Sequence, residues 1–174
     1  EAELLPEKPF IIPEGGTNTA GMIGVAEWAK SVYSQFKQPT TFFLPVGSGG
    51  TLAGFASVPS VHQLMGVPVL KTGEQFTWEI DQLVRYASRP EDRKRTQWQL
   101  IPDYHWGGYA RYPDTLRDFH TKIEKETGIQ FDPVYTSKTL YAMVDMLVRQ
   151  DLSTQDVVIV HTGGLQGKRG IARK

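Results

Sequence analysis

The chain has 174 residues, of which 40% are hydrophobic and 22% charged, and its 19 basic and 19 acidic side chains leave no net charge. This balance argues against a nucleic-acid partner, which needs a basic face, and the absence of Cys excludes a disulfide framework, a thiolate metal site and a cysteine nucleophile. No stretch approaches the roughly 18 consecutive apolar residues of a membrane span, and the first six residues lack the features of a signal peptide. We therefore expect a cytoplasmic protein without a membrane partner and, because the sequence does not begin with Met, a piece of a longer chain.

Short apolar runs alternate with segments of helical periodicity. We expect, in chain order, a first short strand over residues 10–12, a helix over about 21–36, a strand over 40–46, a short helix over 51–58, a strand over 65–70, a helix over 77–87, a weaker strand over 97–101, helices over 113–127 and 137–149, and a strand over 157–160. Strands that alternate with helices imply crossover connections and a mostly parallel sheet. The sequence therefore predicts an α/β fold.

Three of the predicted strands end in glycine-rich turns, at residues 15–16, 47–50 and 163–164. In open parallel sheets, ligands bind outside the carboxyl ends of the strands. We therefore expect the three turns to converge on one crevice.

The second turn, Gly-Ser-Gly-Gly-Thr over residues 47–51, stands between a predicted strand and a predicted helix. Backbone N–H groups at a helix N-terminus attract anions, so a phosphate is the expected guest. The turn is neither a P-loop, because Gly54 is followed by Phe55 rather than Lys, nor a dinucleotide fingerprint, because Leu52 stands where that motif needs Gly. A tight turn that binds nothing is the alternative.

Five motifs occur together in an order and spacing that resemble one family: IIPEGGTNTAGMIG (11–24), PVGSGGTLAG (45–54), WGGYARYP (106–113), GIQFDPVYTSKTLYAM (128–143) and VVIVHTGGLQG (157–167). The chain resembles the 1-aminocyclopropane-1-carboxylate deaminase and D-cysteine desulfhydrase family, which are pyridoxal-phosphate enzymes of the tryptophan-synthase-β-like fold. The resemblance covers nearly the whole chain. It implies a three-layer α/β sandwich, pyridoxal 5′-phosphate as the cofactor and a small amino acid as the substrate.

The resemblance also implies roles for particular residues. The residues expected to bind the cofactor are Gly47, Ser48, Gly49, Gly50 and Thr51 around its phosphate, Thr136 at its ring nitrogen, and Thr162 and Gly163 as a further wall. Tyr109 and Tyr135 match two active-site tyrosines and are expected to be catalytic, although from the residues alone both could equally be packing residues. We expect no metal site, since His62, His105 and His120 have no mutual ligand spacing.

Thr136 is the one residue that bears on the substrate. The deaminases of the family carry Glu at this position and the desulfhydrases carry Thr. A carboxylate favours a protonated ring nitrogen, whereas a hydroxyl can donate to a neutral one. We therefore favour desulfhydrase-like β-elimination over opening of the cyclopropane ring.

The family's Schiff-base lysine has no match here, since Lys138 corresponds to a different family position near the site entrance. The resemblance therefore implies that residues 1–174 are the C-terminal part of the cofactor-binding domain, with its N-terminal part and the small domain absent. We expect this chain to be inactive alone and its full-length parent to be a homodimer. The alternative from a different class is a non-catalytic phosphate- or nucleotide-binding α/β domain.

Overall fold

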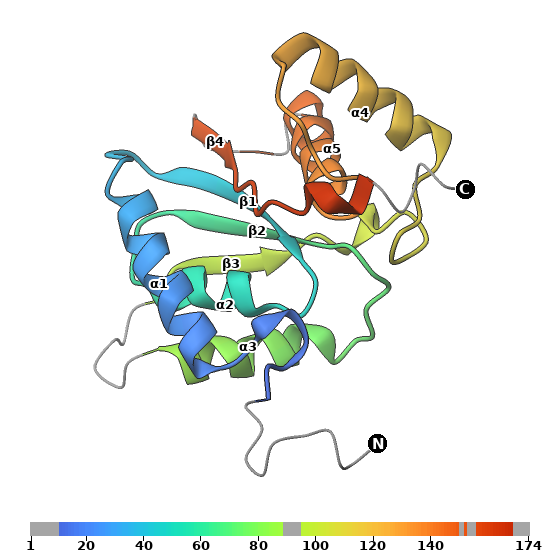
Figure 1. The fold of residues 1–174 in the computed structure, drawn as a ribbon. Helices are drawn as coiled ribbons and strands as arrows, with labels where there is room; N and C mark the ends of the chain where they lie inside the picture. The colour runs from blue at the N-terminus through green and yellow to red at the C-terminus, as the bar shows by residue number, and fades with distance from the viewer. Residues whose placement is uncertain (1–10, 89–94, 150–151, 153–155, 169–174) are drawn as a thin grey trace, which may run out of the picture.

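The computed structural model describes residues 11–88, 95–149, 152 and 156–168. Its regular elements occur in the predicted order (Figure 1), with bounds that differ from the predicted ones by a few residues. The helices are α1 (Thr19–Tyr33), α2 (Gly50–Ser57), α3 (Phe76–Ala87), α4 (Asp114–Thr127) and α5 (Thr136–Val148); the strands are β1 (Thr40–Val46), β2 (Gln63–Pro68), β3 (Gln97–Leu100) and β4 (Asp156–Ile159); and the short 3-10 turns are η2 (Glu14–Gly16), η3 (Pro102–Tyr104) and η4 (Leu165–Gly167).

The first apolar run does not join the sheet. Ile11 and Ile12 are exposed and have no regular structure, while Phe10 lies outside the described residues. Pro13, which follows them, has no N–H to donate to a neighbouring strand, and the chain turns at once into η2. The glycine turn at residues 15–16 therefore follows a loop rather than a strand.

The described strands form a four-stranded sheet in the order β3-β2-β1-β4, and every pair is parallel. Strand β1 is central, so that Phe43 pairs with Met65 of β2 on one side and with Ile159 of β4 on the other. The mostly parallel sheet predicted from the alternation of strands and helices is confirmed.

Two apolar cores cover the two faces of this sheet. Phe42 and Leu44 of β1 pack with α1, α2 and α3 on one face, whereas Phe43 packs with α5 on the other. Figure 1 shows α1, α2 and α3 together on one side, and α5 with α4 beyond it on the opposite side. The fold is therefore a three-layer α/β/α sandwich, and β1 is buried along its whole length because helices cover both of its faces.

Because the described strands are parallel, their carboxyl ends lie at the same edge of the sheet. Strand β1 continues there into the glycine turn over residues 47–50, and β4 continues into the loop over 160–164. Within the described ranges, none of the helices is both long enough and apolar enough to cross a membrane.

Candidate active site

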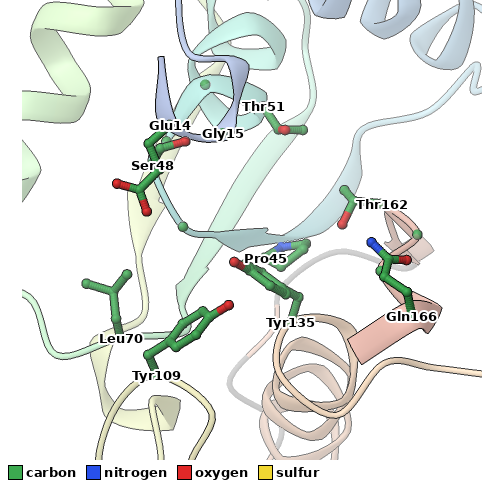
Figure 2. A pocket seen from close by; sticks show the side chains of 15 residues that line it. Glu14, Gly15, Pro45, Ser48, Thr51, Leu70, Tyr109, Tyr135, Thr162 and Gln166 are labelled. Carbon is green, nitrogen blue, oxygen red and sulfur yellow. The ribbon is translucent and has the colours of Figure 1, made fainter. Parts of the chain in front are cut away.

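A cavity of about 870 Å³ lies at this edge of the sheet (Figure 2). All three glycine-rich turns contribute to its wall, so the predicted convergence on one crevice is confirmed. The lining residues are Glu14, Gly15, Pro45, Gly47, Ser48, Gly49, Gly50, Thr51, Leu70, Tyr109, Tyr135, Thr162, Gly163, Gly164 and Gln166.

The turn that joins β1 to α2 forms one wall of the cavity. Gly49 stands immediately before α2 with φ at 91°, a left-handed conformation that glycine adopts readily. The backbone N–H groups of residues 48–51 donate no hydrogen bond to any described part of the chain. Four unpaired donors at the N-terminus of a buried helix are a favourable environment for an anion.

The approach of neighbouring groups explains why this turn is rich in glycine. A Cβ at Gly47 would lie 3.2 Å from Cε1 of Tyr135, and one at Gly49 would lie 2.1 Å from Cδ1 of Ile80. Gly49 therefore lets the turn pack closely on the buried Ile80 of α3, and Gly47 lets it pack closely on the ring of Tyr135.

The η2 turn packs directly onto the glycine turn. The Thr17 and Ser48 hydroxyl oxygens are 2.5 Å apart and share a hydrogen bond. A Cβ at Gly15 would lie 2.3 Å from Oγ of Ser48. Figure 2 shows Glu14 beside Ser48 at the rim of the cavity, where its carboxylate is the charged side chain among the lining residues.

Tyr109 and Tyr135 lie opposite the glycine turn (Figure 2). Their ring centroids are 6.1 Å apart and their planes meet at 75°, an edge-to-face contact. Burial raises the pKa of Tyr135 to about 12, and the neighbouring Tyr109, Asp132 and Glu14 act in the same direction. A tyrosine hydroxyl is protonated at neutral pH already at its ordinary pKa of 10, and the upward shift disfavours its ionisation further. Tyr135 can therefore donate a hydrogen bond into the cavity that it lines.

Asp132 fixes the place of Tyr135 at the start of α5. Its carboxylate is fully buried and accepts hydrogen bonds from the N–H groups of Val134 at 2.9 Å, Tyr135 at 2.7 Å and Thr136 at 2.8 Å. An Asp at the start of a helix satisfies N–H groups that have no partner within the helix. Asp132 was not predicted from the sequence, although an Asp shortly before a predicted helix is a known start signal.

Thr136 is not among the residues that line the cavity, and its expected place at the ring nitrogen stays a prediction. Its side chain is fully buried, and its hydroxyl donates to Oδ2 of Asp132 at 2.7 Å while accepting from the Asp132 N–H at 2.8 Å. The hydroxyl therefore takes part in the cap of α5. The other nine predicted site residues all lie on the cavity wall.

The loop after β4 provides the remaining wall. Nδ1 of His161 accepts a hydrogen bond from the Gly163 N–H at 3.1 Å, and its Nε2 lies 2.8 Å from the Gln130 carbonyl oxygen. His161 therefore holds Thr162 and Gly163 in place through its two ring nitrogens. Gln166, which also faces the cavity (Figure 2), lies in η4 and carried no signal in the sequence.

The lining residues include no lysine. Lys138 is buried behind Tyr135 on α5, and its ammonium is bonded to three backbone carbonyls. The described residues also contain no cluster of three or more His, Cys, Asp or Glu side chains suited to a metal ion.

Known proteins share this sequence pattern and this fold, although no family model matches the chain. A protein of Pyrococcus horikoshii named "Putative 1-aminocyclopropane-1-carboxylate deaminase" is 30% identical over 165 residues, which are 92% of this chain and 50% of the relative. A protein of the same name from Thermotoga maritima is 29% identical, covering 92% of this chain and 53% of the relative.

Two solved structures extend the comparison. The crystal structure of an ACC deaminase homologue superposes with a TM-score of 0.79 at 29% identity, over 92% of this chain and 51% of the other. The processed threonine deaminase isoform 2 of Solanum lycopersicum superposes with a TM-score of 0.52 at 12% identity, over 87% of this chain and 46% of the other, and shows the fold alone.

These matches confirm the class of fold, an α/β sandwich of the pyridoxal-phosphate enzyme type that the resemblance implied. They also confirm the predicted resemblance to the 1-aminocyclopropane-1-carboxylate deaminase family. The chain spans about half the length of the curated relatives that it matches.

Proposed function

We propose that the cavity is the cofactor and substrate site of a pyridoxal-phosphate-dependent deaminase or desulfhydrase acting on a small amino acid, and that this chain supplies one part of that enzyme. The observation that carries the proposal is the set of four unpaired N–H groups at residues 48–51, which face the same cavity as two tyrosines. The matched relatives bear the name of such a deaminase.

The residues present fit the phosphate of the cofactor. The four N–H groups and the dipole of α2 would bind it. Thr162 and Gly163 would form the wall beyond the ring. When bound, the cofactor supplies an electron sink for the bonds around the amino-acid carbon.

The side chains of this chain would orient the bound groups and handle one proton. Tyr135 holds a proton on its hydroxyl and would donate it, or a hydrogen bond, to the reacting amino acid. Tyr109 packs edge-on against Tyr135 and would shield that side of the cavity from water.

A Thr at the ring nitrogen favours elimination from D-cysteine, whereas the matched relatives bear the name of a 1-aminocyclopropane-1-carboxylate deaminase. The Thr136 hydroxyl donates to Asp132 in this structure, and its place at the ring nitrogen is a proposal from the family resemblance. D-cysteine and 1-aminocyclopropane-1-carboxylate therefore both stay within the proposal.

The isolated chain is proposed to be inactive, because covalent catalysis of this type needs a positioned lysine amine and the cavity wall contains none. The parent is proposed to be a cytoplasmic homodimer without a nucleic-acid partner, in keeping with the balanced charge of this part. If the parent also lacks such a lysine, the phosphate site would instead belong to a non-catalytic phosphate- or nucleotide-binding domain.

The experiment has two arms. The full-length parent is assayed with D-cysteine for sulfide release and with 1-aminocyclopropane-1-carboxylate for ammonia release, and the 174-residue chain is assayed in parallel. We expect turnover of one substrate by the parent and none by the chain. A parent that binds pyridoxal phosphate but turns over neither substrate would contradict the proposed substrates, and turnover by the chain alone would contradict the assignment of its missing part.

A further inference from the structure

Lys138 is a fully buried lysine that the proposed chemistry does not use. Its Nζ donates to the backbone carbonyls of Val69 at 3.0 Å, His105 at 2.9 Å and Gly108 at 2.8 Å. An ammonium group has three N–H donors, so each of them is satisfied. Burying a charge is unfavourable unless it is hydrogen-bonded, and here neutral carbonyls rather than a carboxylate provide those bonds.

The three carbonyls belong to two segments that reach the cavity. Val69 follows β2 and directly precedes Leu70, a lining residue, while His105 and Gly108 belong to the loop that leads to Tyr109. Lys138 itself is on α5, one turn after Tyr135. The Lys138 ammonium on α5 is therefore bonded to two other segments that surround the cavity, the end of β2 and the loop before Tyr109.

The loop before and after Tyr109 has an unusual backbone. Trp106 has φ at 57° and Ala110 has φ at 56°, and the two glycines between them also have positive φ. Residues other than glycine rarely adopt this conformation, and it persists where surrounding contacts enforce it. Besides the Lys138 bonds, the described contacts of the loop include the ring of Trp106 against Tyr141, with centroids 4.8 Å apart.

We infer that Lys138 is a positioning residue, whose ammonium ties the loop over residues 105–108 and the end of β2 to α5 and thereby holds Tyr109 against Tyr135. The restraint acts on the backbone, because the accepting atoms are carbonyl oxygens. The effect of this restraint on turnover rests on the proposed function. The restraint itself is independent of that function.

Deprotonation of Lys138 should weaken the restraint, so its strength is expected to depend on pH. Burial lowers the pKa of Lys138 to about 8, and the negative charge of Asp132 opposes this shift. The charged side chains near the loop over residues 105–108 have both signs. Lys71 lies beside Gly108 and Arg111 beside Gly107, whereas Asp103 precedes the loop and Asp145 of α5 accepts from the Tyr104 hydroxyl and pairs with Arg149. The His105 ring accepts from the Gly107 N–H. A neutral amine has two N–H groups, so one of the three carbonyls loses its donor when Lys138 is deprotonated.

The test is hydrogen exchange of the 174-residue chain, read at residues 105–111 and, as a reference, across α2. Lys138→Met keeps most of the side-chain volume and removes the donors, and Lys122→Met on the exposed face of α4 is the matched control. We expect exchange in the 105–111 segment to accelerate at least about tenfold in Lys138→Met, since a hydrogen bond to a charged group is worth that much or more. Unchanged protection of this segment in a folded Lys138→Met chain would overturn the inference.

Chemical rescue separates loss of the ammonium from loss of packing. The chain contains no Cys, so Lys138→Cys can be alkylated selectively with 2-bromoethylamine in denaturant and refolded, which restores an amine at nearly the length of lysine. We expect the alkylated chain to regain protection at residues 105–111 and the unalkylated chain to lack it. Equal protection in the two forms would contradict a role for the ammonium.

A third measurement needs no substitution and applies even if neither variant folds. Exchange of the unsubstituted chain is followed from pH 7 to 10 and corrected for the intrinsic rate at each pH. We expect protection of residues 105–111 to fall with deprotonation of Lys138 while α2 stays protected. Protection of the segment that is constant to pH 10, or that falls together with α2, would contradict the inference whether or not the parent proves to be a pyridoxal-phosphate enzyme.

Discussion

The Thr136 hydroxyl lies 2.7 Å from Oδ2 of Asp132, and it accepts from the Asp132 N–H at 2.8 Å. Both residues are fully buried. This reciprocal pair completes the cap of α5 and places Tyr135, which stands between the two residues in the sequence, at the cavity wall. Thr136 therefore supports the site by stabilising the start of α5, on which Tyr135 stands.

Replacement of this hydroxyl is expected to destabilise the chain. Thr136→Val removes a donor from the buried Asp132 carboxylate and an acceptor from the Asp132 N–H, which should lower the free energy of unfolding by about 1–3 kcal/mol. Thr139→Val is the matched control, because the Thr139 hydroxyl bonds only to the Tyr135 carbonyl within the same helix. Denaturant unfolding of both variants measures the difference, and equal losses would show that the Asp132 pair has no special weight.

A side chain at Gly49 is expected to be more harmful than one at another left-handed glycine. Gly49→Ala adds a clash with Ile80 to the strain of a positive φ, whereas Gly128→Ala at the end of α4 has φ at 71° and nothing within 4 Å of the new Cβ. The strain alone is worth about 1–2 kcal/mol. We expect Gly49→Ala to exceed Gly128→Ala in lost stability, and Ile80→Val to recover part of the excess in the double variant. Thermal and denaturant unfolding would refute the packing explanation if the two alanine variants lose the same stability.

Acid should destabilise the chain through Glu124. Burial alone would raise the pKa of Glu124, but contacts with Lys168, the Phe131 N–H and the His120 ring outweigh it and hold the pKa at about 2. A carboxyl whose pKa is lower in the folded state stabilises the fold above its unfolded pKa of about 4.5 and loses that contribution as the pH falls towards 2.

The corresponding measurement is the free energy of unfolding from pH 6 to pH 2.5. Glu124→Gln should remove a pH-dependent part of the unfolding free energy on the order of 2 kcal/mol. Glu126→Gln is the control, because Glu126 is exposed and lies two residues further along the same helix, and it should leave the pH dependence nearly unchanged. An identical pH profile for the unsubstituted chain and Glu124→Gln would disprove the stabilising role of this carboxylate.

Loss of the Tyr135 hydroxyl should separate catalysis from phosphate binding. In the full-length parent, Tyr135→Phe keeps the ring against Gly47 but removes the proton that the raised pKa retains. We expect kcat to fall by about 10²-fold or more with cofactor occupancy unchanged, as measured by steady-state kinetics and cofactor absorbance. An unchanged kcat would exclude Tyr135 from proton handling.

Patterns that depend on local sequence predicted most of the fold. The run over residues 40–46 is apolar and β-branched because helices cover both of its faces, and its predicted bounds are those observed. The run ending at Ile12 has a similar composition, but a strand needs a partner, and the chain turns away at Pro13. Composition alone cannot distinguish these two cases.

The parts of the site that depend on glycine turns and strand ends could be predicted from the sequence. The contacts between residues far apart in the sequence could not. The turn over 47–51 was recognisable because its three glycines, together with Gly54, exceed what a simple turn needs. Lys138 binds Val69, 69 positions earlier in the chain, and Ser48 binds Thr17, 31 positions earlier. Such pairs are set by tertiary packing and have no local sequence signal. The bond between the Thr136 hydroxyl and Asp132 was likewise not predicted, and the place of Thr136 at the ring nitrogen stays a prediction.

The central claim is that the backbone N–H groups of residues 48–51 form the phosphate site of the cavity. The most direct measurement is an amide NMR titration of the 174-residue chain with pyridoxal 5′-phosphate, repeated with inorganic phosphate. The predicted result is that the largest shifts fall on Ser48, Gly49, Gly50 and Thr51 with both ligands, and that Gly49→Ala abolishes them. Shifts that are absent from this turn, or that are confined to another surface, would contradict the claim.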